Sequence, residues 1–172
     1  TNPTVTGCVA TALAQVFAYW RFPEALLVDI PAYTTYTKRL KVPAIASGEP
    51  YDWDRMLDIY EEGYYSQEEA DAVAKLMLHC GAALQMDYTS SSSGANIFLA
   101  KLTKYFGYDA ETMQELERDH YSLEEWMDLL DAELQAKRPV LYSGSSSTVG
   151  HQFVCDGSDG DGLYHRSRQP EG

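Results

Sequence analysis

The chain has 172 residues, with 26 acidic and 13 basic side chains, a formal net charge of −13 and a pI near 4.5. This charge favours solubility, and it argues against a nucleic-acid-binding protein and against docking on an anionic membrane, because both need a basic surface. The length predicts one domain over residues 1–172, no apolar run approaches the ~20 residues of a membrane span, and the start shows no signal-peptide pattern, which predicts a mature or excised segment.

The first predicted element is a helix that begins at Cys8 and ends before Pro23, since the residue preceding a proline disfavours helix. Its apolar residues recur at helical spacing, at Val9, Leu13, Val16, Phe17 and Trp20. Residues 24–50 contain three prolines and little periodicity, which predicts an irregular stretch with one short strand. A short helix is predicted from residue 51 to about residue 60.

A capping box predicts the start of the next helix, because the Ser66 side chain can cap the first turn and Glu69 stands three residues later. We expect the C-cap of this helix at Gly81. Its buried face is predicted at Ala70, Val73, Ala74, Met77 and Leu78. Residues 88–94 are rich in serine and predict a loop.

Two more helices are predicted before the sequence changes character. Apolar spacing from Ile97 predicts a helix that ends at Gly107. A second capping box, Ser122 with Glu125, predicts a helix that Pro139 terminates. One side of this helix is expected to hold Leu123, Trp126, Met127, Leu130 and Leu134.

The last part of the chain has strand character. Apolar runs at residues 140–142, 151–156 and 163–165 are separated by Asp-Gly turn signals, which predicts an antiparallel meander. Helices followed by antiparallel strands indicate the α+β class. We therefore expect N-terminal helices packed on a C-terminal antiparallel sheet.

The chain has three cysteines at wide spacing, so a disulfide framework and a structural zinc site are both disfavoured. Cys80 and Cys155 lie in apolar surroundings and are predicted to be buried. Cys8 stands directly after Gly7, where a helix begins and free backbone N–H groups favour a thiolate and a developing oxyanion. Gly7 would let a substrate backbone approach. A packed cysteine on an amphipathic helix is the alternative for Cys8.

A thiolate also needs a base, and the chain offers four histidines. His151 begins an apolar strand after a glycine, so it would be presented at a sheet edge, which suits a general base. His165 ends the following strand and is a second candidate. His79 is expected to bond helix C-terminal carbonyls, and His120 lies in an acidic loop and is expected to be solvated.

The chain contains five short motifs in this order: T-G-C-V-A-T-A-L-A-Q at 6–15, Y-D-W-D at 51–54, M-D-Y at 86–88, F-G-Y at 106–108 and V-G-H-Q-F-V at 149–154. With these motifs the chain resembles the streptopain-type papain-like cysteine peptidases, the interpain group included. The resemblance runs nearly end to end. Several motifs at compatible spacing are more specific than any one of them alone.

The resemblance implies a papain-like α+β fold with Cys8 as nucleophile, its backbone N–H in the oxyanion hole, and His151 as the base. It carries no catalytic role onto His165. It further implies that two loops border the substrate cleft, with substrate-binding positions at Ser92, Ser93, Val149 and Gly150. No metal or organic cofactor is implied.

The resemblance also implies the location, the activation and the substrates of the whole protein. It indicates a secreted bacterial cysteine endopeptidase linked to virulence, which is made as a zymogen with an N-terminal propeptide. Its substrates would be proteins or peptides with an apolar side chain two residues before the cut. Nucleic acid and a membrane span are not implied.

The sequence departs from the family at both ends. It lacks the upstream segment with a glutamine that helps to build the oxyanion hole, and Ser167 and Arg168 stand where an Asn-Trp pair orients the histidine. The domain is therefore expected to be incomplete, with weak activity or none in this form. An inactive peptidase-like module that binds peptides is the alternative function, and a transglutaminase-like acyl-transfer enzyme is a lesser one.

Overall fold

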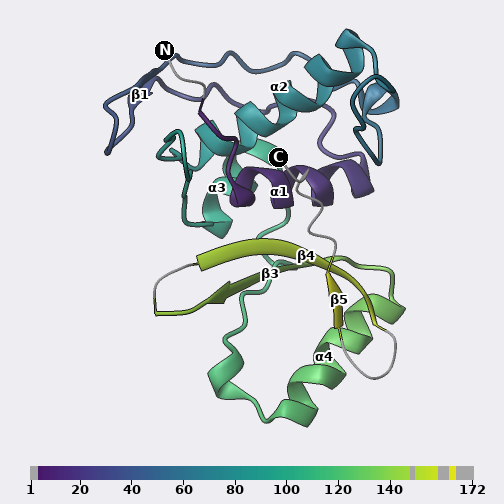
Figure 1. Cartoon of the computed structure of the whole chain (residues 1–172). Coiled ribbons are helices and arrows are strands. Elements are labelled where there is room, and N and C mark those ends of the chain that lie inside the picture. Colours follow the sequence, from purple (N-terminus) through teal and green to yellow (C-terminus); the bar gives the residue numbers. More distant parts are fainter. Residues whose placement is uncertain (1–3, 148–149, 159–162, 166–172) are drawn as a thin grey trace. The chain divides into compact units, whose positions relative to one another are not determined.

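The computed structural model describes residues 4–147, 150–158 and 163–165. The chain divides into two compact units, residues 1–112 and 113–172, and each is described here by itself (Figure 1). The described residues contain four α-helices and two small antiparallel sheets, which agrees with the predicted α+β class. Among these residues no helix has both the length and the apolar character that crossing a bilayer requires.

The first unit contains α1 (Cys8–Trp20), whose limits agree with the prediction. Alanine and leucine favour the helix, and its buried side chains are Val9, Ala10, Ala12, Leu13, Ala14, Val16 and Phe17. The helix ends because Arg21 adopts the left-handed conformation, with φ of 50°. The Phe17 ring lies 4.8 Å from the rings of both Phe106 and Tyr108, which joins the helix to the later part of the unit.

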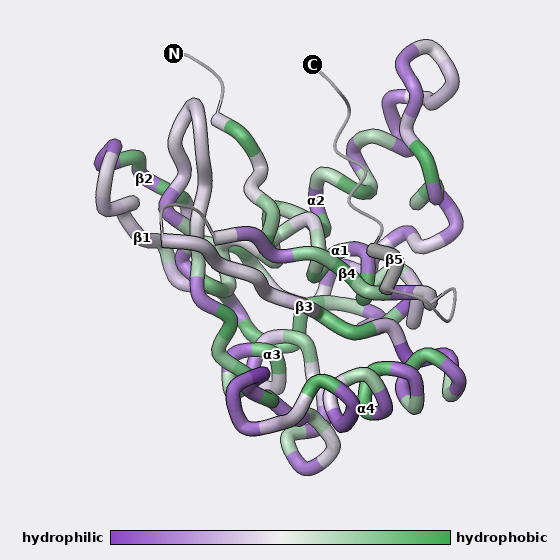
Figure 2. Tube along the Cα trace, turned by 60° about the horizontal axis from the view of Figure 1, so that its bottom comes forward, coloured by the Kyte–Doolittle hydropathy of each residue, from purple (hydrophilic) through white to green (hydrophobic). Residues whose placement is uncertain are grey.

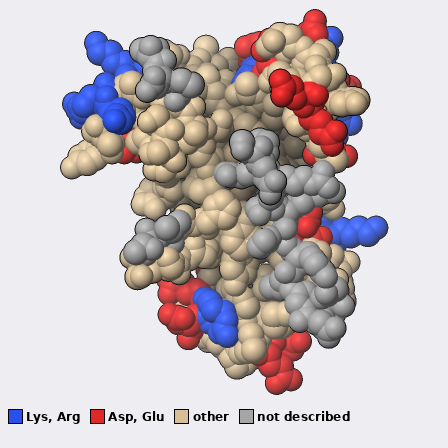
Figure 3. Space-filling model, viewed as in Figure 1, with Lys and Arg blue, Asp and Glu red and all other residues tan. Residues whose placement is uncertain are grey.

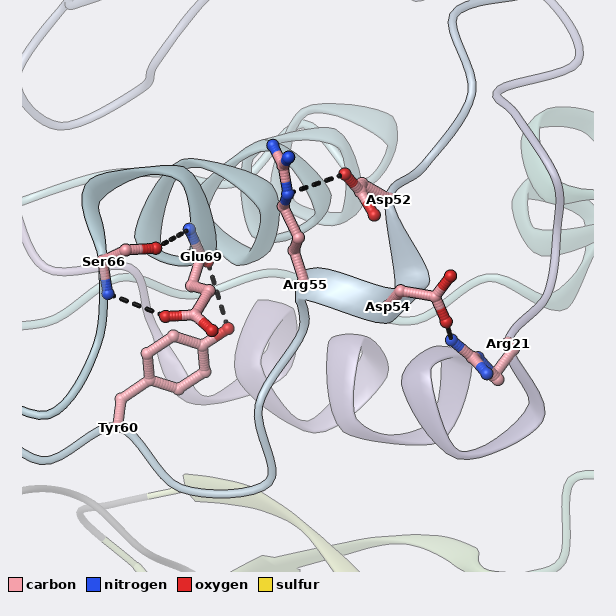
Figure 4. Close-up of polar contacts among 7 residues, drawn as sticks. All are labelled: Arg21, Asp52, Asp54, Arg55, Tyr60, Ser66 and Glu69. Carbon is pink, nitrogen blue, oxygen red and sulfur yellow. Dashed lines mark hydrogen bonds and ion pairs between the residues drawn. The ribbon is translucent and has the colours of Figure 1, made fainter.

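The second helix, α2 (Gln67–Ala83), packs against α1 and begins with the predicted capping box. The Glu69 N–H donates to Ser66 Oγ at 3.2 Å, and the Ser66 N–H donates to Glu69 Oε2 at 2.7 Å (Figure 4). Both donors would otherwise lack a partner at a helix N-terminus. The prediction of this helix start is confirmed.

The predicted buried face and C-cap of α2 are wrong. Ala74 and Leu78 are exposed, and the buried residues are Leu76, His79, Cys80, Gly81, Ala82 and Ala83. Gly81 lies inside the helix, where a Cβ atom would collide with Tyr88 Oη. The glycine therefore serves a close packing contact rather than a helix end.

Residues between α1 and α2 form short elements. The strands β1 (Tyr33–Thr34) and β2 (Lys41–Val42) pair antiparallel, so the stretch contains two short strands instead of the one predicted. The predicted helix over residues 51–60 is only a 3₁₀ turn, η1 (Trp53–Arg55). The Leu57 N–H donates to Tyr60 Oη at 3.0 Å, which in turn donates to the Glu69 carbonyl at 3.1 Å. These bonds replace the backbone hydrogen bonds of a helix, and Figure 4 shows the one between Tyr60 and Glu69.

Two exposed ion pairs involve residues of η1 (Figure 4). Arg21 pairs with Asp54, and Arg55 Nε lies 3.4 Å from Asp52 Oδ2. These side chains are well exposed, so each pair contributes little to stability. The helix α3 (Leu99–Phe106) completes the unit and ends at Gly107 in the left-handed conformation, as predicted.

The second unit contains the 3₁₀ turn η2 (Arg118–His120), α4 (Leu123–Gln135), β3 (Val140–Ser145), β4 (Gly150–Ser158) and β5 (Leu163–His165). Its strands pair antiparallel in the order β3-β4-β5, as predicted. The capping box at Ser122 is present. Hydrophobic and hydrophilic positions alternate along α4 (Figure 2), with Trp126 and Leu130 buried. Leu123, in the first turn of the helix, is exposed.

Candidate active site

Cys8 is the first residue of α1 and is partly exposed. The Thr11 N–H is the first to bond back along the helix, to the Gly7 carbonyl at 3.2 Å, and Thr11 Oγ1 donates to the same oxygen at 3.0 Å. The backbone N–H of Cys8 therefore precedes the helical ladder and lies at the positive end of the helix dipole. This position suits both a thiolate and an oxyanion beside it.

Gly7 is fixed by a loop that follows α2. Its φ of 87° is a conformation that glycine adopts readily. A Cβ atom there would lie 2.7 Å from the Ser93 carbonyl oxygen and 3.0 Å from Met86 Sδ. The sequence suggested that this glycine leaves room for a substrate, but in the structure the space beside it is filled by Ser93.

The loop of residues 87–94 clasps the segment that leads into Cys8. Ser93 Oγ donates to the Val5 carbonyl at 2.6 Å and accepts from the Thr89 N–H at 3.2 Å, while the Val5 N–H donates to the Thr89 carbonyl at 3.1 Å. Backbone bonds between Asp87 and Gly94 close the loop. The segment that leads into Cys8 is thus positioned by residues some eighty positions later in the sequence.

The two serines predicted to bind substrate differ in this loop. Ser93 is 7% exposed, and its hydroxyl donates one bond and accepts another within the clasp. Ser92 is exposed. Their substrate-binding role stays a prediction.

His151 lies near the start of β4, opposite Gly144 of β3, and is exposed. Its ring stacks on Phe153 at a centroid distance of 5.9 Å, and Phe153 stacks on Tyr142 at 5.2 Å. Trp126 of α4 meets Tyr142 edge-on at 5.9 Å and donates from Nε1 to Tyr142 Oη at 2.9 Å. We call these four side chains the aromatic ladder, because they connect the histidine to the buried side of α4.

Of the other predicted positions in the second unit, the structure describes Gly150 and His165. Gly150 is exposed and pairs with Ser145, whereas Val149 lies outside the described residues. His165 belongs to β5 and pairs with Cys155. Because Cys8 belongs to the first unit and His151 to the second, their pairing stays a prediction.

His79 does not bond the end of its helix, which corrects the prediction. It is 6% exposed, and its Nδ1 lies 2.8 Å from Tyr51 Oη. Burial, followed by the nearby Lys75 charge, lowers the pKa of His79 to about 4. The imidazole is therefore neutral near pH 7 and forms part of the buried core, where it contacts Tyr51. His120 is exposed beside Glu117, as predicted.

The three thiols differ in how far they are buried. Cys80 and Cys155 are buried, as predicted, and burial raises the pKa of both. All three cysteines are free. Cys8 is the one that is partly exposed, and the choice between a nucleophile and a packed cysteine on an amphipathic helix stays a prediction.

Sequence reasoning missed two parts of this arrangement. The clasp between Val5 and Ser93 joins distant segments through a backbone carbonyl, and the sequence carries no signal for it. The aromatic ladder did leave a signal: His151 and Phe153 are two residues apart in a strand, so they share a face, and Tyr142 lies in the neighbouring predicted strand.

Known proteins resemble this chain in sequence and in fold. The Peptidase C10 family model matches residues 1–167. Streptopain of Streptococcus pyogenes is 34% identical over 171 residues, covering 93% of this chain and 42% of streptopain. The thiol protease/hemagglutinin PrtT of Porphyromonas gingivalis is 30% identical over 161 residues, covering 93% of this chain and 18% of PrtT. The chain thus spans less than half the length of these relatives.

Solved structures confirm the predicted papain-like fold. The active cysteine protease interpain A of Prevotella intermedia superimposes with a TM-score of 0.81 at 36% identity, covering 94% of this chain and 70% of interpain A. A prointerpain A fragment from the same organism gives a TM-score of 0.74 at 37% identity, covering 89% of this chain and 49% of the fragment. The predicted resemblance to the streptopain and interpain group is confirmed.

Proposed function

Because the chain belongs to the Peptidase C10 family, we propose that it forms the catalytic part of a bacterial cysteine endopeptidase that hydrolyses protein substrates. One observation carries the proposal. Of the three thiols, Cys8 alone is partly exposed, and it stands at the N-terminus of a helix whose other residues are largely buried. This is where a nucleophilic thiolate is expected.

The reaction proceeds through a thioester. The Cys8 thiolate attacks the peptide carbonyl carbon, and the Cys8 backbone N–H donates to the oxyanion. His151 then gives a proton to the leaving amine as the C–N bond breaks. In the second half His151 takes a proton from water, the resulting hydroxide attacks the thioester, and the carboxylic acid leaves as the thiolate is restored.

The mechanism requires both units in one papain-like domain over residues 1–172. The sulfur and the imidazole must come within hydrogen-bond reach, about 3 Å in a reactive complex. Interpain A supports this arrangement, because its fold matches across nearly the whole chain. The loop of residues 87–94 and the end of the hairpin at Gly150 would then border the substrate. Ser92, Ser93 and Val149 are the other proposed substrate-binding residues.

The whole protein is proposed to be secreted as a zymogen. A prointerpain A structure among the relatives supports an N-terminal propeptide as a partner. Substrates would carry an apolar side chain two residues before the cut.

A peptidyl epoxide that alkylates thiolates tests the proposal on this chain and on its full-length parent. We expect one adduct, on Cys8, and casein cleavage by the mature full-length protein that Cys8→Ala abolishes. His151→Gln should remove cleavage while leaving the fold intact, and His120→Gln, which changes an exposed histidine, should leave cleavage unaltered. Absence of a Cys8 adduct in the full-length protein, together with cleavage that persists in Cys8→Ala, overturns the proposal.

Two other outcomes point to the alternatives. An intact protein that binds peptides without cutting them is a peptidase-like binding module. Products in which an amine has replaced the leaving group indicate acyl transfer to amines instead of hydrolysis.

A further inference from the structure

A turn in the first unit concentrates positive charge in a protein that is otherwise acidic. The turn, residues 35–41, carries Lys38, Arg39 and Lys41 and no carboxylate, although the chain has a net charge of −13. All three side chains are exposed, and among the described residues they have no ion pair or ring contact. Basic side chains gather over this turn, which joins β1 and β2, at the upper left of Figure 3. We call residues 35–41 the basic turn.

The backbone of the basic turn is held in place. Thr35 is buried; its N–H donates to the Leu40 carbonyl and its Oγ1 accepts from the Leu40 N–H, both at 2.9 Å. Thr37 donates to Asp87 twice, from its N–H at 3.0 Å and from Oγ1 at 2.6 Å. These bonds lower the pKa of Asp87. The cations therefore project from a fixed backbone, so a ligand would not have to order it.

A hollow of about 530 Å³ lies beside the turn. The turn supplies Thr37 and Lys38 to its wall, and the opposite wall is the loop that clasps the segment before Cys8, with Thr89, Ser91 and Ser92. The lining thus combines a cation, hydroxyl groups and the Asp87 carboxylate. Such a lining matches the backbone and carboxylate side chains of an extended polypeptide.

We propose that the basic turn and this hollow bind an acidic segment of a polypeptide. Carboxylate side chains of the segment meet Lys38, Arg39 and Lys41 at the rim. Peptide N–H groups meet Asp87 and the loop hydroxyls within the hollow, which keeps the carboxylates away from Asp87. If the proposed peptidase function holds, this segment belongs to the protein substrate and lies on the side of Cys8 that the clasping loop borders.

Nucleic acid and anionic membranes fit this surface less well. Their affinity comes from many contacts between cations and phosphates, and the turn offers three cations beside a carboxylate in a strongly acidic chain. A short acidic peptide segment needs only a few.

Binding is measured on the full chain with Cys8→Ala, so that the result does not depend on cleavage. The probes are fluorescein-labelled decapeptides with four Asp and Glu residues, and the same peptides with Asn and Gln, followed by fluorescence anisotropy at 50 mM salt. We expect the acidic peptide to bind more tightly and salt to weaken it, because exposed charges are screened. The double variant Lys38→Glu with Lys41→Glu should weaken peptide binding about tenfold, because it removes two exposed ion pairs and each of them contributes a few-fold in affinity.

The matched control is Lys101→Glu with Lys104→Glu, which changes net charge equally on α3. Arg39 is kept in both proteins because its φ of 54° belongs to the turn. Equal binding of acidic and amide peptides, equal loss in both double variants, or tighter binding to duplex DNA or phosphatidylserine vesicles through the turn would each overturn the inference. Peptide binding without cleavage by the full-length protein would defeat the proposed function alone, whereas cleavage without peptide binding would defeat this inference alone.

Discussion

The region that carries Cys8 and the region that carries His151 are stabilised by different means. Behind Cys8, the residues Ala10, Leu13 and Phe17 are almost completely buried, so the proposed nucleophile begins a helix anchored in a core. His151 lies on an exposed hairpin, where strand pairing with Gly144 and the aromatic ladder hold it. The comparison shows that burial anchors the helix that begins at Cys8, while ring contacts that lead to α4 support His151.

The largest effect should come from the core behind the nucleophile. Leu13 is 0% exposed, and Leu13→Ala should lower the free energy of unfolding by about 4 kcal/mol, through lost burial and the cavity left behind. Leu78→Ala makes the same change at a site that is 46% exposed and should cost less than about 1 kcal/mol. Urea unfolding measures both. Equal losses would show that burial does not distinguish these positions.

The residue before the nucleophile comes next. Gly7→Ala should lower the free energy of unfolding by about 3 kcal/mol, since it combines a positive φ with a collision against the Ser93 carbonyl. Gly48 has a similar φ of 89° but nothing within 4 Å of its Cβ position, so Gly48→Ala should cost only about 1 kcal/mol. The difference isolates the clasping loop. If both variants lose the same amount, the loop does not constrain Gly7.

A third test uses pH. The pKa of His79 is depressed to about 4 in the folded chain from 6.5. The stability that the neutral imidazole provides is therefore present above pH 6.5 and is lost as the pH falls towards 4, by on the order of 2 kcal/mol. Urea unfolding between pH 7 and pH 4 should show a shallower decline in His79→Gln than in the parent, and an unchanged decline in His120→Gln. Parallel curves for all three proteins would contradict the buried contact with Tyr51.

The smallest effect should appear at the ladder. Trp126→Phe and Tyr142→Phe each remove the bond from Nε1 to Oη, so a double-mutant cycle should give a coupling energy of about 1 kcal/mol. In NMR spectra of the same variants, the signals of the His151 ring protons should also shift, since the stacked rings of Phe153 and Tyr142 move. A coupling near zero with unmoved His151 signals would show that the hairpin holds the histidine without the ladder.

Local signals were enough for much of the fold. Both capping boxes and the glycine after α3 act within one helical turn, and they predicted helix ends correctly. The position of Cys8 at the start of α1 also followed from local sequence. The family motifs supplied the papain-like architecture, which periodicity alone did not give.

Errors arose where distant residues decided the structure. The buried face of α2 differs by roughly a third of a turn from the apolar face that the sequence predicted, because the core includes His79, whose polar ring bonds Tyr51. The expected helix after Tyr51 is limited to a 3₁₀ turn because Tyr60 binds the chain to the start of α2. Neither contact has a signature in the local sequence. The proposed pairing of Cys8 with His151 would likewise depend on contacts between residues far apart in the chain.

The contact between Gly81 and Tyr88 also constrains how this protein can evolve. The Tyr88 hydroxyl occupies the space that any side chain at position 81 would need, and burial raises the pKa of this tyrosine to about 12. An alanine at position 81 therefore requires either that the Tyr88 ring shifts or that the tyrosine is replaced by a smaller residue. Substitutions at the two positions are coupled, so a smaller residue at position 88 would widen the choice of residues at position 81.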